Sequence, residues 1–282
     1  MNTYKSHTVL RTLIIGSAFF TATASASIQY NFTSSANSFS SGAEVSGHTF
    51  SATGSGPNAQ VSGWSSSGAG ATLESAQIFS WNGLGVDHDG CCNNNTDDHH
   101  STDNAGTGDD AILISFAEDI ELTGLSLGWW ASDYDISVLA YTPDTTPTLV
   151  GETYSGMTSS GWEVIDHISD IQFSTNSTTG NKEASIDSNG TSSSYWIVSA
   201  YLGTGVVGQP LNWTRPRSLR GGNDYFKLSG VSGVPGQTPK PPPTTGVPEP
   251  STILLLGLGL LAIWHYKRDN KHNHQEKQSL AC

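Results

Sequence analysis

Short stretches in which apolar and polar residues alternate recur along the chain, and no segment keeps a helical period. Clusters of Gly, Ser, Asn and Thr separate these stretches, which is typical of all-β proteins. The pattern predicts an all-β fold, an antiparallel β-sandwich of the jelly-roll type. The clearest predicted strands are 111–116, 121–129, 135–141, 195–202 and 225–231, and weaker ones are 28–32, 72–79, 162–165 and 171–173.

Two irregular points interrupt this pattern. In the segment 120–130 the apolar positions alternate, but their phase changes at Thr123-Gly124, which predicts a β-bulge or a tight bend. The segment Gly83-Leu-Gly-Val86 is predicted as a turn that leads into an acidic loop. We therefore expect a folded domain over 27–234, built from short strands.

The first residues have the features of a signal peptide over 1–26. Lys5 and Arg11 make the N-terminal region positive, an apolar stretch follows at 13–20, and small residues close the segment at Ala24-Ser25-Ala26. We expect cleavage after Ala26, with cleavage two residues earlier as the rival site and an uncleaved anchor as the alternative. In either case the chain is exported.

The C-terminal part combines a proline-rich linker, 235–246, with a short motif, an apolar stretch and a basic pair. The apolar stretch at 253–264 predicts a transmembrane helix, with a cytoplasmic tail over 269–282. Proline disfavours a helical conformation in the residue before it, so the motif is expected to be extended. The motif and the basic pair consist of Val247, Pro248, Glu249, Pro250, Lys267 and Arg268.

This order of parts over 247–268 resembles the PEP-CTERM sorting domain of Gram-negative bacteria. The resemblance implies an exosortase-type processing enzyme as a partner and a transient stay in the inner membrane. It also implies delivery to the cell surface or the extracellular matrix. On this basis we expect a protein associated with exopolysaccharide or a biofilm.

Charge and cysteine content narrow the partners. The formal net charge is −13, from 25 Asp and Glu against 12 Lys and Arg. An acidic surface repels nucleic acid, so no nucleic-acid partner is expected. The same charge favours cations or simply keeps the protein soluble. Only Cys91, Cys92 and Cys282 are present, which excludes a disulfide scaffold.

One loop, 87–110, concentrates seven Asp, three His and two Cys. Three interpretations remain open. The first is a solvated, turn-rich loop, because Asn, Asp and Gly form turns. The second is a Ca²⁺ site, because carboxylate and amide oxygens suit a hard cation. The third is a transition-metal site of imidazole and thiolate ligands. The Ca²⁺ candidates are Asp97, Asp98, Asp103, Asn104 and Asp109, and the transition-metal candidates are His88, Cys91, Cys92, His99 and His100.

No catalytic motif was found in the sequence, so the chain is predicted not to be an enzyme, and no residue is assigned a catalytic role. Glu152 and Glu163 could be assigned as a glycosidase pair, but chance pairs are expected in a chain with 25 Asp and Glu. Trp129 and Trp130 point to opposite faces of a predicted strand, so one of them is a candidate for sugar contact. The alternatives to a non-enzymatic surface protein are a calcium-supported carbohydrate-binding module and a secreted polysaccharide hydrolase.

Overall fold

A computed structural model describes residues 27–37, 40, 42–68, 70–87, 101–105, 108–210, 219 and 221–236. The predicted signal peptide, the sorting segment 247–268, the tail and most of the linker lie outside these residues. None of the helices in the described part has the length and apolar character needed to cross a membrane. The predicted transmembrane helix, 253–264, lies outside the described residues.

The described residues confirm the all-β class, with 14 strands and a few short helices. The helices are η1 (Ser34–Ala36), η3 (Tyr154–Ser159), η4 (Asp170–Gln172) and α1 (Thr204–Val207). The strands are β1 (Ile28–Asn31), β2 (Ala43–Glu44), β3 (Thr49–Phe50), β4 (Ala59–Ser66), β5 (Leu73–Ser80), β6 (Leu84–Asp87), β7 (Thr102–Asp103), β8 (Asp109–Trp130), β9 (Ile136–Tyr141), β10 (Trp162–Ile168), β11 (Ser174–Thr175), β12 (Lys182–Ser185), β13 (Ser193–Ala200) and β14 (Tyr225–Pro235).

Strand β8 organises the domain. Its first half pairs with β4 and β13, and its second half pairs with β14 and β12. The sequence predicted two strands here, separated by a short segment that contains Ala117, Glu118 and Asp119. These residues are exposed and contain neither Gly nor Pro, so the chain stays extended while its neighbours change.

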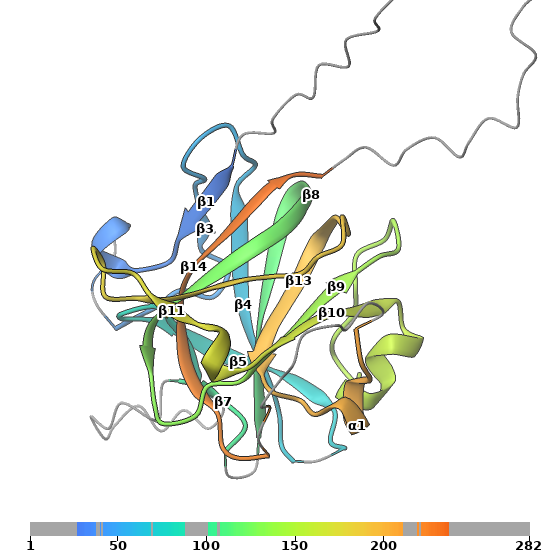
Figure 1. The fold of residues 1–282 in the computed structure, drawn as a ribbon. Helices are drawn as coiled ribbons and strands as arrows, with labels where there is room; N and C mark the ends of the chain where they lie inside the picture. The colour runs from blue at the N-terminus through green and yellow to red at the C-terminus, as the bar shows by residue number, and fades with distance from the viewer. Residues whose placement is uncertain are drawn as a thin grey trace, which may run out of the picture. The chain divides into compact units, whose positions relative to one another are not determined.

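Five of the strands pair in a closed ring. Strands β14, β6, β5, β4 and β8 pair in that order, and β8 pairs with β14 again. From the first half of β8 the sheet continues through β13, β9 and β10, while β1 pairs with β14 and β11 pairs with β12 (Figure 1). The two halves of β8 thus carry two different parts of the sheet.

The main core lies inside this arrangement, and a second core covers the outer side of the β8–β13–β9 strands. Ile112, Ile114 and Phe116 point into the main core, while Ala111 belongs to the second. Strands buried on both faces need nearly continuous apolar sequence, which explains the run Ala111–Phe116. The second core is closed by residues from η3, α1 and β10, among them Tyr154, Met157, Trp162 and Val207.

The irregularity predicted at Thr123-Gly124 is a β-bulge. Leu122 pairs with Gly233 and Gly124 pairs with Ser232, so Thr123 is an extra residue on β8. The bulge lets Leu122 and Leu125 both reach the core.

Two local predictions were wrong. The predicted strand 171–173 overlaps helix η4, whose first turn is held by a capping box in which Ser169 N–H donates to Gln172 Oε1 over 2.9 Å. The turn predicted over 83–86 is mostly strand β6, because the chain already bends over residues 81–83, where Gly83 has a φ of 144°.

Candidate metal centre

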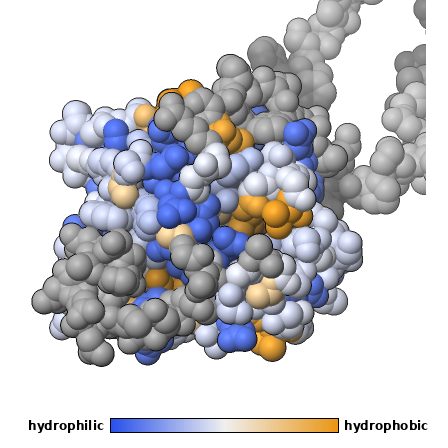
Figure 2. Space-filling view, turned by 90° about the horizontal axis from the view of Figure 1, so that it is seen from below, coloured by the Kyte–Doolittle hydropathy of each residue, from blue (hydrophilic) through white to orange (hydrophobic). Residues whose placement is uncertain are grey.

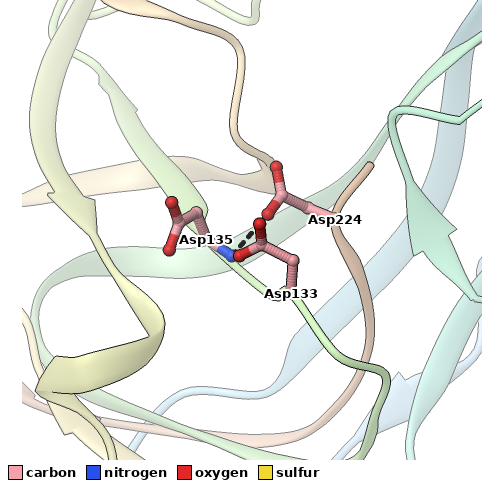
Figure 3. A group of neighbouring side chains, drawn as sticks. All are labelled: Asp133, Asp135 and Asp224. Atoms are coloured by element: carbon pink, nitrogen blue, oxygen red, sulfur yellow. Dashed lines mark hydrogen bonds between the residues drawn. The ribbon is translucent and has the colours of Figure 1, made fainter. Parts of the chain in front are cut away.

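Three aspartates converge at one end of the domain. Asp133 and Asp135 lie between β8 and β9, and Asp224 directly precedes β14. One carboxylate oxygen of each lies within 4.8 Å of the other two (Figure 3). The antiparallel pairing of Phe226 with Trp130 brings the end of β8 beside the start of β14. Sheet topology therefore joins residues that are far apart in the sequence.

Asn104 ties the acidic loop to this group. Its Nδ2 donates to Asp224 Oδ2 over 3.0 Å and to the carbonyl oxygen of Tyr201 over 3.1 Å. In return, the backbone N–H of Asp224 donates to Asn104 Oδ1 over 2.7 Å. We call Asp133, Asp135, Asp224 and Asn104 the aspartate centre.

The aspartate centre is largely shielded from water. Asp135 and Asp224 are fully buried, and Asp133 is partly buried. Asp135 N–H donates to Asp224 Oδ1 over 2.8 Å, and Asp170 N–H donates to Asp135 Oδ1 over 2.8 Å. The Oδ1 atoms of Asp133 and Asp170 are buried, and neither has a hydrogen-bond partner among the described residues.

Burial dominates the electrostatics here. Burial raises the pKa of Asp224 to about 8, and the negative charges of Asp135 and Asp133 add to the increase, against the hydrogen bonds that it accepts from Asp135 N–H and from Asn104. Burial, followed by the charge of Asp170 and then those of Asp135 and Asp133, also raises the pKa of Tyr134. The centre is therefore a place of strongly negative potential.

The electrostatic repulsion between these carboxylates can be reduced in one of two ways. Two like charges 4 Å apart repel by about 4 kcal/mol at an effective dielectric constant near 20. Either a proton neutralises Asp224, or a cation binds between the carboxylates. The carboxylate oxygens suit Ca²⁺, and the group includes no His or Cys that would favour Zn²⁺ or copper.

The Ca²⁺ ligands suggested by the sequence separate into two places. Asn104 joins the aspartate centre, whereas Asp103 and Asp109 lie with Asp110 at the start of β8. Asp103 N–H donates to Asp110 Oδ2 over 3.4 Å, and burial, followed by the Asp103 charge, raises the pKa of Asp110 well above its usual range. Burial also raises the pKa of Asp109. The other loop candidates, Asp97, Asp98, His88, Cys91, Cys92, His99 and His100, lie outside the described residues.

Sequence reasoning did not single out Asp133, Asp135 or Asp224. The only local signal was the Asp-Tyr-Asp spacing after a predicted strand. Figure 2 shows the molecule from below, with hydrophilic residues across the middle of this face and apolar residues beside them.

The predicted sugar-contact and carboxylate residues lie elsewhere. Trp129 and Trp130 are both partly buried, and each has a lysine ammonium over its ring. Lys227 Nζ lies 5.1 Å from the Trp129 ring centroid and Lys182 Nζ lies 5.2 Å from that of Trp130. Glu152 accepts a hydrogen bond from Ser160 Oγ over 2.9 Å, and Glu163 lies on β10. A role in sugar contact or catalysis stays a prediction for all four.

Comparison with known families finds the PEP-CTERM protein-sorting motif at residues 246–268. This match confirms the predicted sorting segment, including Val247, Pro248, Glu249, Pro250, Lys267 and Arg268. It supports a bacterial surface protein that is exported, anchored in a membrane and sorted by an exosortase. No significant match to a curated protein was found.

Proposed function

We propose that this chain is a non-enzymatic surface protein of a Gram-negative bacterium. Its sorting segment holds it in the inner membrane until an exosortase-type enzyme processes it, and the folded domain then becomes part of the exopolysaccharide matrix. The observation that carries the proposal is the sorting motif at 246–268 on an acidic chain whose described residues form an all-β domain. We retain the jelly-roll-like sandwich as the proposed description of that domain.

Calcium is the proposed cofactor of the domain. Extracellular modules bind Ca²⁺ with dissociation constants of about 10⁻⁴ to 10⁻³ M. The aspartate centre offers carboxylate oxygens from two separate segments, so one cation would join the β8–β9 connection to the start of β14. We propose a structural role, because a cation bound to the folded state alone stabilises it.

Sorting is tested by following the protein in cells with and without the exosortase gene. We expect a surface form that has lost the C-terminal segment when the enzyme is present, and an inner-membrane form of full length when it is absent. Replacing Glu249 with Ala and both flanking prolines with Ala should trap the full-length form. A matched control replaces the exposed residues Thr175 and Ser174 with Ala, which should leave sorting unchanged.

Two results would contradict this proposal. One is a surface form whose intact mass still includes Cys282 in cells that carry the enzyme. The other is unchanged localisation of the Pro-Glu-Pro variant. N-terminal sequencing of the same surface form tests the predicted signal peptide, and we expect Ser27 as the first residue.

A further inference from the structure

A polar trough of about 660 Å³ lies on the part of the sheet formed by the second half of β8 and its neighbours. Two rows of residues, paired in register, cross its floor from β1 through β14 and β8 to β12. One row is Gln29, Ser232, Gly124 and Ser185, and the other is Asn31, Gly230, Ser126 and Glu183.

These rows face away from the main core. On β1, Ile28 and Tyr30 point into the core, so the alternate residues Gln29 and Asn31 point outward and are exposed. On β8, the core residues are Leu125 and Leu127, which leaves Gly124 and Ser126 on the outer face. The trough is therefore a feature of the outer face of the sheet.

The middle of the trough is deepest because its two central strands, β14 and β8, carry only the small residues Gly and Ser in the two rows. A Cβ atom on Gly124 would lie 2.7 Å from Ser232 Oγ, and one on Gly230 would collide with the backbone oxygen of Tyr30. Larger side chains stand at the sides, including Gln29 on β1 and Asn181 beside β12. Adjacent strands lie about 4.8 Å apart, so the four strands span about 14 Å, enough for a sugar chain.

The chemistry of the lining restricts the ligand. Among the described residues that line the trough, amides and hydroxyls predominate, Glu183 is the one carboxylate, and there is no Lys or Arg. An anionic polymer would find no cation there, and an apolar peptide or lipid would leave these polar groups without partners. A neutral sugar has hydroxyls that both donate and accept, as amides and hydroxyls require.

Several groups in the trough are already held in place. Ser126 Oγ and Ser229 Oγ lie 2.8 Å apart, and Asn181 Nδ2 donates to Ser229 Oγ over 3.1 Å. On the side formed by β11 and β12, Asn176 Nδ2 donates to Glu183 Oε1 over 2.7 Å. Groups fixed in this way lose little conformational entropy when a ligand binds.

We propose that this trough binds a stretch of neutral polysaccharide. The site is distinct from Trp129 and Trp130, which do not line it. The proposal deepens the proposed matrix function and rests on that function for the natural source of the sugar. Because the trough has no aromatic platform among its outward-facing residues, binding depends on many hydrogen bonds repeated along a polymer.

Affinity gel electrophoresis of the full-length chain tests the proposal, with dextran, glycogen, galactomannan or a β-1,3-glucan cast in the gel. We expect at least one of these neutral polymers to retard the protein, and alginate, which is anionic, not to do so. Ser185→Trp should weaken the retardation about tenfold, because the ring would lie over Gly124 and fill the trough. Gln29→Ala should weaken it about threefold by removing one amide.

Ser75→Trp is the matched control, because Ser75 is an exposed strand residue on β5 outside the trough. It should bind like the wild type, and all variants should melt like the wild type. The proposal is overturned if no neutral polymer retards the wild type, if alginate alone does, or if Ser185→Trp binds as tightly as Ser75→Trp. If the protein binds a neutral polymer but does not reach the cell surface, only the sorting proposal is wrong. If it is sorted correctly but binds no neutral polymer, only the proposal of a polysaccharide site in the trough is wrong.

Discussion

Asp224 in the aspartate centre is fully buried, whereas Ser185 in the trough is exposed. Both regions are polar. Strands β8 and β14 form the middle of the trough, and the residues that follow β8 and precede β14 form the aspartate centre. In the first, carboxylates meet with a pKa raised to about 8 for Asp224. In the second, neutral amides and hydroxyls cover an open face. The contrast shows that burial and charge, rather than polarity itself, decide which ligand a region suits.

The pH dependence of stability should separate the two regions most strongly. An unfolded Asp has a pKa of about 4 and folded Asp224 one of about 8, so the folded state keeps a proton that the unfolded state releases between these values. Without cations, stability should therefore fall as pH rises from 5 to 8, by up to about 1.4 kcal/mol per pH unit from this group.

Asp224→Asn removes this titration and provides the comparison. Its melting temperature should depend less on pH than that of the wild type, although Asp109 and Asp110, whose pKa values burial also raises, will keep part of the slope. Thermal melts in chelator at several pH values measure both slopes. Equal slopes would mean that Asp224 titrates normally.

Removal of the Asp224 side chain should destabilise the domain by about 2–4 kcal/mol at pH 5.5, where the carboxyl is protonated. Asp224→Ala leaves Asp135 N–H without its acceptor and removes one of the two acceptors of Asn104 Nδ2. Asp144→Ala is the control, because Asp144 is exposed, and it should change stability by less than about 0.5 kcal/mol. Urea unfolding measures both variants, and similar midpoints would contradict the contacts described here.

A double-mutant cycle should show that the acidic loop is coupled to the aspartate centre. Asn104 Nδ2 donates to Asp224 Oδ2, and either substitution removes this side-chain hydrogen bond, so Asn104→Ala and Asp224→Ala should be non-additive by about 0.5–3 kcal/mol. The cycle is measured by urea unfolding at pH 5.5. Additive effects would place Asn104 outside the centre.

The smallest effect is expected for the trough. Gln29→Ala and Ser185→Trp replace exposed strand residues, so each should change the free energy of unfolding by less than about 0.5 kcal/mol. Urea unfolding of the proteins prepared for the gel assay measures this value. A large loss of stability would show that these side chains support the fold.

The sequence predicted the strands whose side chains alternate or are all apolar, and it located the bulge at Thr123-Gly124 from a change of phase. Strand β4, whose sequence is mostly small and polar, gave no such signal, because its place between β5 and β8 depends on pairing with distant residues. The centre was only partly predictable for the same reason. Asn104 was a candidate, but Asp133, Asp135 and Asp224 meet only when β14 returns beside β8.

Thermal melting of the full-length chain at pH 7.5, with Ca²⁺ or with chelator, tests the cation claim most directly. We expect Ca²⁺ at a hundred times its dissociation constant to stabilise the protein by about 2.7 kcal/mol, with a matching rise in melting temperature. The shift should disappear in Asp224→Ala and persist in Asp144→Ala. Melting curves that superimpose with Ca²⁺ and with chelator would show that protons alone neutralise the aspartate centre, and the calcium proposal would be wrong.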